Sequence, residues 1–160
     1  MEYSDLVKDF AVRTQSNLNT LQNLQEAHPE IAVFEVTQLV NSLLGLLIFP
    51  REKYMERIPR TSLQELEKAG WNIPVTSEGY KKPKDLRHLV CLMRNAVAHC
   101  NLEFIAKASS DIEGIKLWNT TMRSPRDRTW EGEISLSELR CFVEKFVAMF
   151  RDLDLGNTPT

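Results

Sequence analysis

The sequence is poor in cysteine and histidine, with three residues of each. The cysteines Cys91, Cys100 and Cys141 form no Cys-x-x-Cys pair, and an odd number cannot close a complete disulfide framework. We therefore expect reduced thiols and a cytoplasmic protein. A zinc site would have to come from His88, Cys91, His99 and Cys100, because the chain has no second cluster of ligands. We expect neither a metal nor a cofactor.

The sequence also lacks a large charge of one sign. Lys and Arg number 20 against 22 Asp and Glu, which leaves a formal net charge of -2. This balance excludes proteins that coat nucleic acid through bulk electrostatics, so any RNA contact must be local. Two basic clusters offer local charge, one at 81–84 with Arg87 and one at 123–128. Each either holds phosphates or is an ordinary solvated loop. From the first cluster, Lys82, Lys84 and Arg87 are candidates for contacts with a substrate.

An uninterrupted membrane-spanning run is missing as well. Residues 31–49 are the most hydrophobic segment, but they are interrupted by Glu35, Gln38, Asn41 and Ser42. Such groups are costly in a bilayer, whereas they form one polar stripe on a helix that is otherwise buried. Gln38 in this stripe is a further candidate for substrate contact. Gly45 continues the stripe, and it indicates either close approach of another helix, including one from a second subunit, or an incidental surface glycine.

The N-terminal half of the chain reads as helices. Apolar residues recur at helical spacing over 4–27, and His28-Pro29 ends that pattern. A second helix is expected over 31–49, stopped by Pro50. Short helical stretches are expected near 51–57 and 62–69, followed by a polar loop.

The C-terminal half reads as two helices around a β insertion. Asp85 is the expected N-cap of a long helix whose buried side extends from Leu86 to Cys100 and Phe104. A β-hairpin is expected from Ile112 to Ile134, with its turn at 124–127. Ser135 and Glu138 form the capping box of the last helix. We expect one mainly all-α domain over 1–153, with a small hairpin before the last helix and a frayed tail at 154–160.

Common catalytic signatures are absent, since no Walker, GxGxxG, GxSxG or HExxH pattern occurs. The chain has instead Arg94-Asn95-Ala96-Val97-Ala98-His99, which we expect in the middle of the long helix. A helix advances about 100° per residue, so Asn95 and His99 project from one face and Arg94 flanks them. Arg suits a phosphate, and His can exchange a proton near neutral pH. The alternative is that these side chains form ordinary surface ion pairs.

These residues and the helical pattern resemble the HEPN superfamily, whose signature is RNxxxH. The segments from Phe34 to Gln38, from Leu44 to Leu46 and at Phe49-Pro50 are similar to a branch known mainly from hypothetical proteins of bacteria and plasmids. The resemblance covers about 4–153. It implies a four- to five-helix up-and-down bundle that forms a homodimer, with both motifs facing one cleft.

The resemblance also implies a function. Many HEPN proteins are metal-independent endoribonucleases, often toxins of toxin–antitoxin or other conflict systems, and others are not catalytic. Arg94, Asn95 and His99 match the motif positions. Some antitoxin-controlled members carry a tyrosine, modified with adenylate, two residues after the histidine, but this chain has Asn101 there. That modification is therefore not expected.

The chemistry of the motif explains why a dimer is needed. Metal-free RNA cleavage needs a base, an acid and positive charge beside the phosphate. One chain offers a single well-placed histidine, and a two-fold dimer supplies two. The expected product carries a 2′,3′-cyclic phosphate. The alternatives are a catalytically silent HEPN module that binds RNA, nucleotide or a protein partner, such as an antitoxin, and a purely structural helical dimer.

Overall fold

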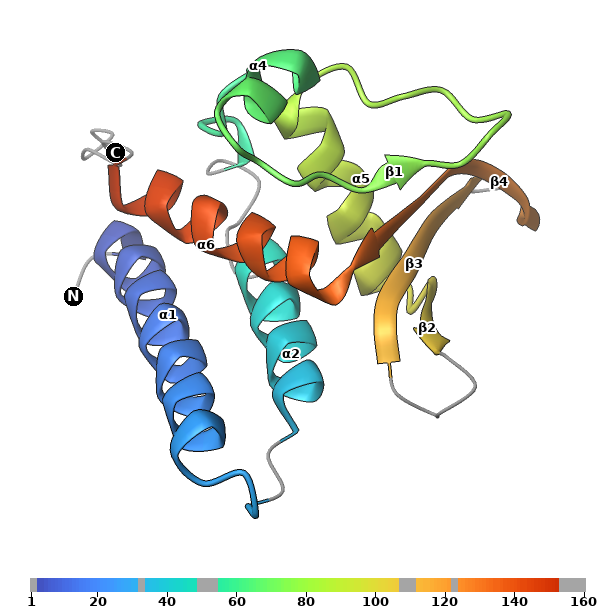
Figure 1. Cartoon of the computed structure of the whole chain (residues 1–160). Coiled ribbons are helices and arrows are strands. Elements are labelled where there is room, and N and C mark those ends of the chain that lie inside the picture. Colours follow the sequence, from blue (N-terminus) through green and yellow to red (C-terminus); the bar gives the residue numbers. More distant parts are fainter. Residues whose placement is uncertain (1–2, 32–33, 49–54, 107–111, 122–123, 153–160) are drawn as a thin grey trace. The chain divides into compact units, whose positions relative to one another are not determined.

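The structure is a computed structural model that describes residues 3–31, 34–48, 55–106, 112–121 and 124–152 (Figure 1). The chain divides into two compact units, one formed by Met1–Arg57 with Val143–Thr160 and one by Ile58–Phe142. The helical stretch expected near 51–57 lies mostly, and the tail expected at 154–160 entirely, outside the described residues. The elements in chain order are α1 (Tyr3–Ala27), α2 (Glu35–Ile48), α4 (Leu63–Lys68), β1 (Val75–Thr76), α5 (Leu86–Ala98), β2 (Leu102–Ala106), β3 (Ile112–Thr121), β4 (Ser124–Ser135) and α6 (Leu136–Asp152).

The first unit contains α1 and α2, which the apolar spacing predicts. The first helix ends at Ala27, directly before His28 and Pro29. The second helix begins at Glu35 rather than at the expected residue 31. None of the described helices combines the length and the apolarity that a bilayer crossing requires.

Gly45 lies where α1 and α2 pack against each other. A Cβ atom at this position would lie 2.5 Å from Cζ of Phe10, which is closer than a side chain tolerates. The glycine therefore permits close approach of a neighbouring helix. That helix is α1 of the same chain, so Gly45 has a packing role without a second subunit.

The second unit is built around a β-sheet, and the expectation of a mainly all-α bundle is wrong. The sheet has four antiparallel strands in the order β1-β4-β3-β2. The hairpin expected before the last helix is present as β3 and β4, with Ile115 opposite Ile134 and Leu117 opposite Gly132. Its turn is not at 124–127, because these residues belong to β4. The hairpin is thus the centre of a sheet and not a small insertion.

The long helix that carries the motif is shorter than predicted. It ends at Ala98, and Phe104 lies in β2, where it is 46% exposed. The reason is a Schellman-type helix end. Cys100 takes the left-handed conformation with φ 54°, its N–H donates to the carbonyl of Val97 at 3.0 Å, and the N–H of Asn101 donates to that of Ala96 at 2.8 Å. The chain then turns into β2, although apolar residues continue at helical spacing.

One face of the sheet packs against α5, which lies beside β3 in Figure 1. Alternation along the strands places Ile115, Leu117 and Asn119 on this face, and all three are buried. Trp130, which is opposite Asn119, is also buried. The sheet therefore supports the helix that carries the motif.

The start of α6 agrees with the sequence. The backbone N–H of Ser135 and its hydroxyl donate to Glu138 at 3.0 and 2.6 Å, and the N–H of Glu138 donates back to the Ser135 hydroxyl at 3.3 Å. This is the expected capping box. The hydrogen bond from the Ser135 hydroxyl holds the pKa of the Glu138 carboxyl below its ordinary value.

Substitution of Cys100 tests the helix end. Cys100→Val places a β-branched side chain at positive φ and should lower the free energy of unfolding by about 1–2 kcal/mol. Cys100→Gly removes the Cβ atom and should leave that free energy unchanged or raise it. Urea denaturation followed by circular dichroism measures both. Equal destabilisation by valine and glycine would show that the thiol matters and the backbone conformation does not.

Candidate functional site

The motif occupies the last turn of α5, not the middle of a helix. Arg94 is half-buried, whereas Asn95 and His99 are exposed. His99 is the C-cap residue, and its N–H donates to the carbonyl of Asn95 at 3.1 Å. Asn95 and His99 are therefore one turn apart, as predicted, and the imidazole is at the solvent-exposed end of the helix.

Strand β3 forms hydrogen bonds to the chain on both sides of the last turn of α5, one in the middle of the helix and one just after its end. The side-chain Nδ2 of Asn119, which is 7% exposed, donates to the carbonyl of Leu92 at 2.6 Å. The backbone N–H of Trp118 donates to the carbonyl of Asn101 at 3.1 Å. Asn119 was not among the functional residues predicted from the sequence. The available signal was a polar residue at an inward position of a strand that otherwise points Ile115 and Leu117 to the core.

Local hydrogen bonds and ion pairs do not engage the motif side chains among the described residues. Within the described part of the chain, Arg94, Asn95 and His99 form no side-chain hydrogen bond and no ion pair. The alternative of ordinary surface ion pairing thus gains no support from these residues. The three side chains present a guanidinium, an amide and an imidazole within one turn and a half of helix.

Cys91 lies one turn before Asn95 and is half-buried. Burial raises the pKa of its thiol, and the nearby guanidinium groups of Arg94 and Arg87 oppose that shift. Because the pKa is raised overall, the thiol stays protonated near neutral pH and is a poor nucleophile. Cys91 is therefore not a candidate nucleophile, and the candidate residues at this helix end stay Arg94, Asn95 and His99.

The alternative of a metal site would need His88, Cys91, His99 and Cys100 as ligands. Among the residues that the structure describes, no three His, Cys, Asp or Glu side chains are grouped so that they could hold a metal ion. His88 has another role, since its Nδ1 accepts a hydrogen bond from the N–H of Lys84 at 3.1 Å.

The residues of the first basic cluster have different surroundings in the structure. Lys82 and Lys84 line a groove of about 520 Å³, and the motif residues are not among the residues that line this groove. Arg87 is half-buried and its Nε donates to the carbonyl of Ile58 at 2.9 Å, so it stabilises the fold locally. Gln38 belongs to the first unit, where it is half-buried on α2. Substrate contact by these four residues stays a prediction.

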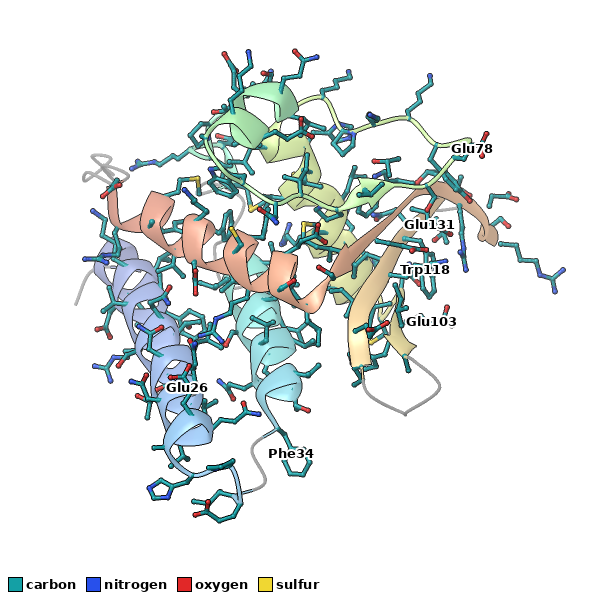
Figure 2. The ribbon with its side chains drawn as sticks, in the orientation of Figure 1. Glu26, Phe34, Glu78, Glu103, Trp118 and Glu131 are labelled. Atoms are coloured by element: carbon teal, nitrogen blue, oxygen red, sulfur yellow. The ribbon has the colours of Figure 1, made fainter. Side chains whose placement is uncertain are left out.

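The second basic cluster is partly neutralised. Arg123 lies outside the described residues. Arg128 forms an ion pair with Glu131 and stacks 4.4 Å above the ring of Trp118. Trp118 and Glu131 are opposite each other on β3 and β4 and lie on the same side of the sheet (Figure 2). The charge of Arg128 is therefore already satisfied on the sheet surface.

Comparison with known proteins identifies the family. No curated protein and no solved structure matches the chain. The model of the family described as HEPN pEK499 p136 matches residues 1–154, which include the motif and all the strands. The match spans nearly the whole sequence and agrees with the RNxxxH motif at 94–99. The chain belongs to the HEPN pEK499 p136 family.

Proposed function

We propose that this protein is a metal-independent endoribonuclease of the HEPN type that acts as a homodimer. The observation that carries the proposal is the presentation of Arg94, Asn95 and His99 on one supported helix end, without local partners among the described residues. Membership of a HEPN family supports a function directed at nucleotides or RNA. The motif supplies the groups that phosphodiester chemistry requires.

The reaction would proceed by internal attack. The imidazole of His99 takes the proton of the RNA 2′-hydroxyl, and the freed oxygen forms a bond to phosphorus. The bond from phosphorus to the 5′-oxygen breaks, and His99 of the partner subunit, as imidazolium, gives that oxygen a proton. The products are a 2′,3′-cyclic phosphate and a 5′-hydroxyl. DNA lacks the attacking hydroxyl and would not be cut.

The other two motif residues would hold the phosphate. Arg94 places positive charge beside the non-bridging oxygens, where negative charge increases in the transition state. Asn95 orients either the imidazole one turn away or the phosphate. The exposed position of His99 suits a site that is completed by a second copy, because its imidazole is not enclosed by its own helix.

The cellular compartment and the biological role of the protein are part of the same proposal. All three cysteines are free thiols, which supports a reducing compartment such as the cytoplasm. Metal-free RNA cleavage suits a toxin or defence effector, and such a protein needs an antitoxin or another means of control. A silent HEPN module is the second candidate. It would be favoured by a monomeric chain, because the one motif histidine of a single chain cannot serve as base and acid at once.

The first test concerns assembly. We expect a homodimer at micromolar concentration, because the proposed site needs two copies of His99. Light scattering coupled to size-exclusion chromatography measures the mass directly. A strict monomer at this concentration would remove the composite site.

The second test concerns the motif side chains. His99→Ala should reduce RNA cleavage by roughly 10²-fold or more while dimerisation and RNA affinity stay nearly unchanged, because general acid–base groups typically contribute that much. Arg94→Ala should reduce both affinity and rate. Cleavage is measured with a chelator present, and circular dichroism controls for folding.

His28 provides a matched control for the second test. It is exposed in the loop after α1 and its Nδ1 lies 3.2 Å from Glu30, so His28→Ala should leave cleavage unchanged. If His99→Ala cleaves as fast as the wild type, the catalytic assignment of His99 is wrong. If the wild type itself leaves the RNA intact, the silent module is favoured.

A further inference from the structure

A candidate second site lies in the unit formed by residues 58–142, and no motif residue lines it. It is the groove of about 520 Å³ between α4, the segment that leads into β1, and the loop at 82–84. The segments that line the groove, namely α4, β1 and the loop at 82–84, are coloured green to yellow-green in Figure 1. Sites for small molecules typically have volumes of roughly 300–1,000 Å³, so the groove is large enough for one.

The walls of the groove are fixed by hydrogen bonds. The N–H of Leu86 donates to the carbonyl of Thr61 at 2.9 Å, and the N–H of Lys84 donates to Nδ1 of His88 at 3.1 Å. In β1, whose two residues also line the groove, Val75 pairs with Glu133 and Thr76 with Gly132. The start of α4 is closed by the capping box of Ser62 and Glu65. A ligand would therefore meet a preformed site and would not need to order a loop.

The lining of the groove combines positive charge with an apolar wall. Lys82 and Lys84 both line it, and neither forms an ion pair with a residue in the described ranges. Pro83 between them restricts the backbone. The wall at 73–75 is Ile, Pro and Val, and Val75 is 70% exposed although it lies in a strand. Pro74 is buried and Ile73 is half-buried, so Val75 presents most of the apolar surface of this wall. Two unpaired ammonium groups beside this apolar surface match a ligand with an anionic group on an apolar body.

Glu67 restricts the distribution of charge on such a ligand. It lines the same groove from α4 and forms no ion pair with either lysine. A chain of phosphates through the groove would place negative charge beside this carboxylate as well as beside the lysines. A small ligand with its negative charge at one end avoids that repulsion. The lining therefore favours a small organic anion over the backbone of RNA.

We propose that this groove binds a small organic anion, a carboxylate or a phosphate ester on an apolar body. Lys82 and Lys84 bind the anionic group, and Val75 with the accessible part of Ile73 contacts the body. The site does not depend on cleavage of RNA by the motif, since none of the motif residues lines it.

The test uses the full chain and three probes. 1-Anilinonaphthalene-8-sulfonate carries an anion on an apolar body, N-phenyl-1-naphthylamine carries only the body, and inorganic phosphate only the anion. We expect the sulfonate to bind most tightly and to shift the amide resonances of 73–76 and 82–84 in heteronuclear NMR spectra. Lys82→Gln with Lys84→Gln should weaken its binding roughly tenfold or more. Val75→Glu should also weaken it.

Lys68 and Lys81 provide the matched control. Both are exposed and neither lines the groove, so Lys68→Gln with Lys81→Gln removes the same charge without touching the site. This pair should bind the sulfonate as the wild type does. Well-dispersed NMR spectra of each variant control for folding.

Four results would overturn the proposal. The first is that Lys82→Gln with Lys84→Gln binds the sulfonate as tightly as the wild type does. The second and third are that the neutral naphthylamine or inorganic phosphate binds the wild type as tightly as the sulfonate does. The fourth is that a single-stranded RNA octamer displaces the sulfonate with the same dependence on both lysines. The last result would assign the groove to the path of RNA. Because binding is read without cleavage, a failure here is distinguishable from a failure of the endoribonuclease proposal.

Discussion

The position of the motif depends on how the chain is held on both sides of the last turn of α5. The buried amide of Asn119 donates to the carbonyl of Leu92 at 2.6 Å, and the N–H of Trp118 donates to the carbonyl of Asn101 at 3.1 Å. Between these two bonds, Cys100 takes a left-handed conformation that ends the helix. A buried amide costs free energy unless it is bonded, so Asn119 also specifies how the helix and the sheet pack. The hydrogen bonds of one strand thus determine where Arg94, Asn95 and His99 are presented.

Local signals in the sequence predicted the elements that depend on local physics. The extent of α1, the capping box at Ser135 and the hairpin of β3 with β4 follow from apolar spacing and capping residues, and the structure confirms them. The all-α fold was wrong because the end of α5 carries a cysteine where a glycine or asparagine usually signals the stop. Apolar residues then continue at helical spacing into β2. The strand β1 has two residues and is made by pairing with β4, which is distant in sequence.

The candidate site was predictable in part, because some of its geometry is local to one helix. The spacing of Asn95 and His99 follows from helix geometry, and they are one turn apart in the structure. The support from Asn119 depends on tertiary packing and could not be read from the chain. The basic cluster at 81–87 looked like one surface, but Lys82 and Lys84 line a groove while Arg87 bonds to the backbone of Ile58. Charge in a sequence does not reveal which partners the fold supplies.

The chemistry of the cut RNA end tests the account most directly. Wild-type protein is incubated with a defined single-stranded RNA and a chelator, and the products are analysed by mass spectrometry. The account predicts a 2′,3′-cyclic phosphate on one fragment, a 5′-hydroxyl on the other, and no cleavage when the 2′-hydroxyl at the cut site is methylated. A 3′-hydroxyl with a 5′-phosphate, or cleavage of DNA of the same sequence, would contradict it.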